Sequence, residues 1–176
     1  TTAGWTSSDS KNTVAIEFGD VDNDGDLDLA VGNYGAVNQV FFNSGSGLST
    51  TAGWSSSDSK NTKDISLGDI NGDGDLDFVS GNKGQATQAF YGTGSSFSTT
   101  ADWSASSANT YSVHIADFNN DGDLDLLEGN WLDKDKIYLN TGSGLPTTTL
   151  WSVGPNSDRT YGTGIADVDG DGDIDI

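Results

Sequence analysis

A nine-residue acidic segment that occurs four times constrains this chain more than any other feature. The copies read DVDNDGDLD, DINGDGDLD, DFNNDGDLD and DVDGDGDID, and they start at Asp20, Asp69, Asp117 and Asp167. Successive starts lie 48 to 50 residues apart. A period of this length is typical of solenoids, propellers and other arrays in which each repeat forms one structural unit.

Each acidic segment has the composition of a calcium loop. Asp or Asn stands at loop positions 1, 3 and 5, Gly at position 6 and Asp at position 9. Calcium takes six to eight oxygen ligands at ~2.3–2.6 Å, which a short loop supplies if alternate side chains converge and the chain turns sharply at Gly. A metal-free Asp/Gly turn is the simpler alternative, but its carboxylates would repel one another without a cation. We therefore predict about four Ca²⁺ per chain.

Other metal motifs and catalytic arrangements fit less well. An EF-hand needs an acid at loop position 12 and flanking helices, whereas Val31, Ser80 and Glu128 occupy that position in the first three copies. Magnesium is too small for a cage of so many protein oxygens. Zinc has almost no ligands to draw on, because the chain has no Cys and only one His, His114. A serine-nucleophile triad would need that same His, so we expect no enzymatic activity.

The charge is concentrated in the four segments. The 176-residue chain has a net charge of −20, and the segments contain 18 of its 27 acidic residues. The remainder of the chain is nearly neutral and has no basic surface of the kind that nucleic acid requires. It also lacks a run of ~18 apolar residues, so no membrane insertion is expected. We expect a single repeat domain with repeats at 1–49, 50–98 and 99–146 and an incomplete one at 147–176.

The residues between the acidic segments predict an all-β fold. Alternating β-branched and aromatic residues favour strands, Gly, Asn, Asp and Ser favour turns, and no helical period is present. One period contains four expected strands, at Thr13–Asp20, Leu27–Asn33, Asn38–Asn43 and Leu48–Trp54. Four-stranded units at this period suggest the antiparallel blades of a β-propeller. The chain is long enough for about three and a half blades.

The run EFGDVDNDGDLDLAVGN, from Glu17 to Asn33, resembles the FG-GAP/VCBS repeats of integrin α-chain propellers and of many secreted bacterial proteins. SLGDINGDGDLDFVSGN and HIADFNNDGDLDLLEGN match the same pattern. The third and fourth copies replace Phe-Gly by Ile-Ala, at Ile115–Ala116 and Ile165–Ala166. The resemblance covers nearly the whole chain. It implies a β-propeller with calcium held in the loop between the first two strands of a blade.

The resemblance also implies a ligand set for each loop, in which position 7 contributes its backbone carbonyl and position 9 binds with both carboxylate oxygens. The residues are Asp20, Asp22, Asp24, Asp26 and Asp28 in the first loop, Asp69, Asn71, Asp73, Asp75 and Asp77 in the second, Asp117, Asn119, Asp121, Asp123 and Asp125 in the third, and Asp167, Asp169, Asp171, Asp173 and Asp175 in the fourth. We expect the fourth site to be the weakest, because only Ile176 follows Asp175.

Two groups of residues are candidates for binding another molecule. A tryptophan recurs at one repeat position, where it either packs between blades or stacks against a sugar; packing is the preferred interpretation. These residues are Trp5, Trp54, Trp103 and Trp151. Variable segments follow each Gly-Asn pair and begin with Tyr34, Lys83 and Trp131. Binding surfaces are often built from variable loops on a constant frame.

The sequence thus predicts a secreted or cell-surface binding protein that recognises a carbohydrate or another extracellular protein. Extracellular calcium is abundant enough to fill weak sites, which favours this location. Two alternatives remain: a filament or homo-oligomer assembled through incomplete blades, and an accessory domain of a polysaccharide-active enzyme. In a closed ring or a pair of chains, the two chain ends would share one blade.

Overall fold

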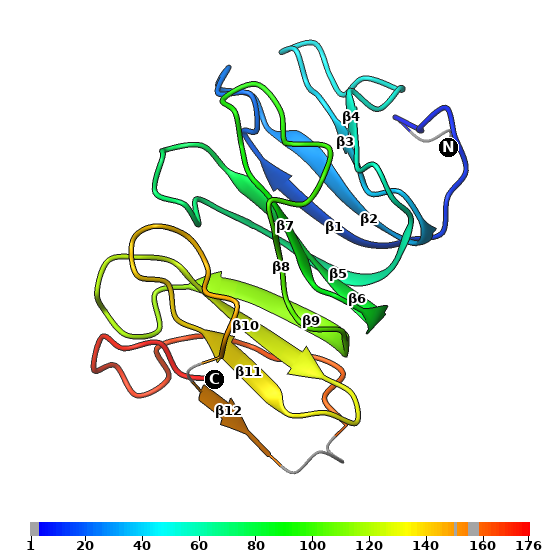
Figure 1. The fold of residues 1–176 in the computed structure, drawn as a ribbon. Coiled ribbons are helices and arrows are strands. Elements are labelled where there is room, and N and C mark those ends of the chain that lie inside the picture. The colour runs from blue at the N-terminus through cyan, green and yellow to red at the C-terminus, as the bar shows by residue number, and fades with distance from the viewer. Residues whose placement is uncertain (1–3, 150, 155–158) are drawn as a thin grey trace.

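The computed structural model describes residues 4–149, 151–154 and 159–176, and within these ranges it contains strands and turns without any helix (Figure 1). Accordingly, none of the described residues forms a helix long and apolar enough to cross a membrane. All strand pairs are antiparallel. The strands are β1 (Thr13–Gly19), β2 (Asp28–Ala36), β3 (Gln39–Phe41), β4 (Trp54–Ser55), β5 (Lys60–Gly68), β6 (Asp77–Gln85), β7 (Gln88–Phe90), β8 (Trp103–Ser104), β9 (Ala108–Ala116), β10 (Asp125–Asn130), β11 (Asp135–Tyr138) and β12 (Trp151–Val153).

The strands form three four-stranded blades, β1–β4, β5–β8 and β9–β12, that stand side by side (Figure 1). Strands β1, β5 and β9 pack next to one another along the inner edge. Short ladders between β2 and β5 and between β6 and β9 join the blades into one open sheet. Beyond β12, which completes the third blade, the fourth repeat contributes two described bridges, Trp131–Arg159 and Ala166–Asp175. This arrangement confirms the predicted propeller blades and their number of about three and a half.

The last strand of each blade is shorter than the sequence indicated. We expected a strand over Leu48–Trp54, but β4 begins only at Trp54. The preceding residues close a turn first, because Asn43 pairs with Leu48 and the amide of Ser49 donates to the Phe42 carbonyl over 2.8 Å. As a result, the outer strand of the first blade comes from the start of the second sequence repeat.

The recurring tryptophans are packing residues. Trp54 is buried, and its ring lies edge-on to Phe90 and Phe97 of the second blade at 5.5 and 5.3 Å. Its Nε1 donates to the Ser98 carbonyl over 3.2 Å. Trp103 repeats the arrangement in the next blade, with an Nε1 bond of 3.1 Å to a backbone carbonyl. The packing interpretation is therefore confirmed for these two residues, whose rings are too deeply buried to stack against a sugar.

Polar side chains on the first strands also join neighbouring blades. Glu17 accepts a hydrogen bond from the amide of Leu67 over 2.9 Å, and Asp64 accepts one from the amide of Val113 over 3.0 Å. Nε2 of His114 lies 2.8 Å from the carbonyl oxygen of Thr163. Each of these contacts joins two neighbouring repeats. His114 therefore has a structural role, because its partner Thr163 belongs to the fourth repeat.

The two ends of the chain do not meet. Trp5 packs edge-on against Phe41 of the first blade at 5.3 Å, whereas the segment around Ile165 lies beside the third blade, at the opposite end of the three blades (Figure 1). The expectation that both ends share a blade is therefore wrong within one chain. The first blade instead presents an open apolar face, on which Ile16 and Phe18 are 60% and 54% exposed.

We predict that Trp54→Ala lowers the unfolding free energy by ~3–5 kcal/mol, because it empties the interface between two blades. Trp151→Ala, the matched control, should lower it by less than ~1 kcal/mol, since that side chain is 44% exposed. Urea unfolding followed by circular dichroism measures both values. Equal losses would contradict the packing role.

Glu128 is a fully buried acid at the position that Val31 and Ser80 occupy in the other blades. Its Oε2 lies 3.5 Å from the hydroxyl of Tyr138 and 4.0 Å from Nζ of Lys136, and its Oε1 has no partner. Burial raises the pKa of Glu128, and hydrogen bonds and the charge of Lys136 offset this only in part. The folded protein therefore holds this proton more tightly than the unfolded chain does.

We predict from this that the contribution of Glu128 to stability is present below pH ~4.5 and is lost as the pH rises through the raised pKa. Glu128→Gln should be more stable than the natural chain at pH 8, on the order of 1 kcal/mol, and nearly equal to it at pH 4. Urea titrations at both pH values in constant calcium would show this. A difference that does not change with pH, or one that Asp58→Asn reproduces, would contradict it.

Candidate metal centres

The first acidic loop connects β1 to β2 and is folded around its own carboxylates. Asp20 follows the end of β1 and accepts hydrogen bonds from the amides of Asp24 and Gly25, both over 3.0 Å. Gly25 has a φ of 92°, which a residue without Cβ adopts readily. Asp24 in turn accepts the amide of Asp26 over 2.9 Å. These bonds hold the loop in a tight coil.

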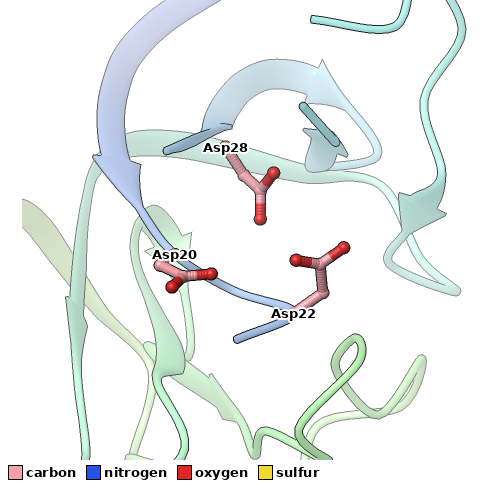
Figure 2. Close-up of side chains that lie close together, drawn as sticks. All are labelled: Asp20, Asp22 and Asp28. Atoms are coloured by element: carbon pink, nitrogen blue, oxygen red, sulfur yellow. The ribbon is translucent and has the colours of Figure 1, made fainter. Parts of the chain in front are cut away.

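Three carboxylates of this loop converge on one point. An oxygen of each of Asp20, Asp22 and Asp28 lies within 4.8 Å of the others, and the side chains face a shared space (Figure 2). Oδ1 of Asp22 is buried and has no hydrogen-bond partner. Asp24 stands outside this group. A buried carboxylate oxygen without a donor, next to two further carboxylates, is what a hard cation would satisfy.

The position-9 aspartate has a role that the sequence did not reveal. Asp28 is fully buried at the start of β2, and its two oxygens accept the amides of Val21 over 2.9 Å and Asn43 over 2.7 Å. It thus ties the loop to the second residue after β3. The same pair of bonds recurs at Asp77, with Ile70 and Gly92, and at Asp125, with Phe118 and Asn140. For the partners beyond the third strand, Asn43, Gly92 and Asn140, the only sequence signal is their place just before a Ser/Thr-Gly turn.

The second and third loops keep this frame with an amide at position 3. Asp69 accepts the amides of Gly72 and Gly74 over 2.8 and 2.9 Å. Asn71 donates from Nδ2 to Asp73 over 2.9 Å, and Asn119 does the same in the third loop over 3.0 Å. The side chains at positions 3 and 5 are therefore held together in both loops.

The fourth loop has the same coil with less support. Its group of Asp167, Asp169 and Asp175 also lies within 4.8 Å, but all three residues are exposed. Asp175 accepts one backbone amide, that of Val168 over 2.9 Å, where its counterparts accept two or three. The lower affinity of the fourth site stays a prediction.

Neighbouring loops are linked in pairs. Asn23 of the first loop donates to Asp75 of the second over 2.8 Å, and Asn120 of the third donates to Asp173 of the fourth. The second and fourth loops have Gly72 and Gly170 at this position. Because glycine has no side chain, this position cannot donate a side-chain hydrogen bond to a neighbouring loop.

The electrostatics of the loops also fit a cation. Burial raises the pKa of Asp77 to about 6, although the backbone amides that donate to this carboxylate lower it. Burial also raises the pKa of Asp125. Burial and the charges of Asp28 and Asp24 raise the pKa of Asp22. The ionised loops are thus under electrostatic strain, and a cation held by positions 1, 3, 5 and 9 and the carbonyl of position 7 would supply the compensating positive charge.

The residues predicted to bind a ligand lie at the other end of the blades, away from the loops. Tyr34 and Lys83 occupy equivalent places near the ends of β2 and β6, and Trp131 follows β10 directly. The ring of Tyr34 lies under Nζ of Lys63 at 4.5 Å, and that of Trp131 stacks on Tyr111 at 5.6 Å. Lys83 is exposed and is not part of these contacts. The sequence did not indicate Lys63 or Tyr111.

Fold and loops together define a repeat-built β-propeller, and comparisons with known proteins agree. A family model described as "FG-GAP-like repeat" matches residues 20–80 and 69–128, so the chain belongs to this family and the resemblance seen in the sequence is confirmed. No curated protein matches the chain at a significant level.

Solved structures with the same fold include two crystal structures of BBS1N in complex with ARL6DN, one soaked with lead and one with mercury. Their TM-scores are 0.58 and 0.60 at 10% identity, over 91% and 89% of this chain. The chain spans about half the length of these proteins, 50% and 48%.

We predict that Asp22→Asn weakens calcium binding to the first loop by at least about tenfold, because it removes charge from the point where the carboxylates converge. Asp26→Asn removes the same charge from the same loop, but position 7 offers its backbone carbonyl, so the affinity should change less than about threefold. Isothermal titration calorimetry of both variants measures this. Equal effects would show that only the net charge of the loop matters.

Proposed function

We propose that this chain is a calcium-stabilised part of an extracellular β-propeller that binds another protein or a carbohydrate and has no catalytic role. The single observation that carries the metal is the buried, partnerless Oδ1 of Asp22 between Asp20 and Asp28. Since the loop recurs four times, we propose about four Ca²⁺ per chain. Calcium at the millimolar level outside cells would keep sites of modest affinity filled, which supports a secreted or cell-surface location.

A protein is the better supported partner. BBS1N, which has the same fold, was crystallised in a complex with ARL6DN. A carbohydrate gains no support from the recurring tryptophans, because Trp54 and Trp103 are buried between blades. Recognition in a propeller that keeps a constant frame would use the variable segments after β2, β6 and β10.

A specific observation favours a second candidate, assembly through blade faces. Beside the exposed Ile16 lies a hollow of ~380 Å³ lined in part by Trp5, Leu29 and Phe41. In the second blade, the equivalent residues Ile65, Phe78 and Phe90 are covered by the first blade. Another blade would cover this face in the same way, either from a second copy or from a longer chain. An accessory role beside a polysaccharide-active enzyme is compatible with either arrangement.

We predict that chelation lowers the thermal stability of the folded protein. Each site adds ~2.7 kcal/mol to the unfolding free energy when calcium exceeds Kd a hundredfold, so several sites together rival the ~5–15 kcal/mol of a typical domain. Scanning calorimetry in millimolar calcium and in excess EDTA tests this, with magnesium as the control cation. A melting temperature that EDTA leaves unchanged would refute a stabilising role for calcium.

The same samples separate the two candidates for the open face. Sedimentation of the calcium-loaded protein gives its mass. A monomer at micromolar concentration would exclude self-assembly through Ile16 and its neighbours, whereas a dimer that Ile16→Asp dissociates would support it.

A further inference from the structure

The first strand of every complete blade contains a bulge at the end away from the acidic loop. Pairing skips one residue in each: Val14 in β1, Lys63 in β5 and Tyr111 in β9. A bulged residue leaves the ladder, and the local bend re-aims its side chain. Tyr161 holds the same position in the fourth repeat. One side chain per repeat is thereby directed out of the sheet along the inner edge of the propeller.

Lys63, Tyr111 and Tyr161 meet residues at the ends of the second strands, Tyr34 and Trp131, and form one continuous row with them. Nζ of Lys63 lies 4.5 Å from the ring centre of Tyr34 and 5.2 Å from that of Tyr111. Tyr111 stacks on Trp131 at 5.6 Å, and Trp131 meets Tyr161 edge-on at 4.4 Å. The guanidinium of Arg159 lies 5.5 Å from the ring of Trp131. We call this set of six residues the cation–aromatic row.

The row lies where the basic residues of the chain gather. By strand direction, all seven lie towards the end of the blades away from the acidic loops: Lys11, Lys60, Lys63, Lys83, Lys134, Lys136 and Arg159. Lys11, Lys60 and Lys136 form ion pairs, whereas no described carboxylate lies within 4.0 Å of Lys63 or Arg159. Lys63 and the first loop residue of its blade, Asp69, are six residues apart along an extended strand, which separates the row from the loops by roughly 20 Å. This exceeds the Debye length of about 8 Å at physiological salt, so the loop charges are largely screened there.

Backbone strain also marks this end of the molecule. Leu132, next to Trp131, has a φ of 56° and is 48% exposed. A left-handed leucine with an exposed apolar side chain is unfavourable on both counts, and such strain is concentrated at functional sites. Tyr161 is 61% exposed, so the row is open to solvent at its C-terminal end.

The arrangement of the rings decides which ligand fits. A sugar would need an open aromatic face, but one face of Trp131 carries Tyr111, and Arg159 and Tyr161 also pack against this ring. The rings therefore hold the two cations, neither of which forms an ion pair with a carboxylate of the described residues. A guanidinium or ammonium positioned on aromatic rings loses little freedom on binding and forms strong, charge-assisted hydrogen bonds with carboxylates. Tyr, Trp and Arg are also the residues that contribute most to protein–protein binding.

We propose that the cation–aromatic row binds an acidic segment of a partner protein, with Lys63 and Arg159 each pairing with a carboxylate of that segment. This rests on the proposed function of the chain as a recognition module, and it names the surface and the chemistry of the protein partner. Such binding is sensitive to salt, because it joins partly exposed opposite charges.

The test uses fluorescein-labelled hexaglutamate as the probe and fluorescence anisotropy as the readout, in 2 mM calcium, with hexaserine and hexagalacturonate as comparison ligands. We expect hexaglutamate to bind, hexaserine not to bind, and affinity to fall between 50 and 300 mM salt. Lys63→Gln and Arg159→Gln should each weaken binding about tenfold, the effect of one lost charge-assisted hydrogen bond. Lys60→Gln, on the same strand but paired with Asp58, should change it less than about twofold.

Three results would overturn the proposal. Equal losses in Lys60→Gln and Lys63→Gln would mean unspecific attraction, tighter binding of hexagalacturonate would mean an acidic-sugar site, and no binding by folded protein would mean no site. Circular dichroism and the melting temperature establish that each variant is folded. This result is separable from the proposed function. If calcium stabilises the fold but hexaglutamate does not bind, only this inference is refuted. If EDTA leaves the melting temperature unchanged, the calcium role is refuted, and binding of hexaglutamate to the cation–aromatic row is judged separately.

Discussion

The buried aspartate at the ninth loop position is the constraint on which the blades depend. Asp28, Asp77 and Asp125 are each removed from water, and each accepts at least one amide from the loop and one from beyond the third strand. One carboxylate therefore fixes the loop, the start of the second strand and the end of the third. Its burial is tolerable because both oxygens are hydrogen-bonded. The cost that remains appears in the raised pKa of Asp77, and a bound cation would remove it.

The blades divide two tasks between their ends. The loop end contains most of the acidic residues and the arrangement suited to metal, whereas the other end contains the basic residues, the bulges and the variable segments. Because the strands between them are short and regular, the bulged residues can change without disturbing the loops. Val14, Lys63 and Tyr111 illustrate this, since they differ completely on an otherwise constant frame.

The sequence predicted the features that repeat and missed those that depend on neighbours in space. The inner strands followed from the alternation around Val14, Ile16 and Phe18, and the loop positions followed from their fourfold recurrence. The amide of Asn43 as a partner of Asp28 was missed, because a backbone donor leaves no side-chain signature and only its place before a Ser-Gly turn marks it. Lys63 and Arg159 were missed for another reason: they meet Tyr34 and Trp131 only when adjacent blades pack. The boundary of β4 was wrong because the Asn43–Leu48 bridge uses that segment for a turn.

The displacement between sequence repeat and blade has a consequence for how such a chain changes length. Since Trp54 completes the first blade from within the second repeat, a cut between residues 49 and 50 falls inside a blade and not between two. If one further repeat is inserted at this junction, its own tryptophan can pair with β3 in place of Trp54. Trp54 then completes the inserted blade in the same way. A change of length by whole repeats would therefore keep each blade supplied with its outer strand, whereas a change by part of a repeat would not.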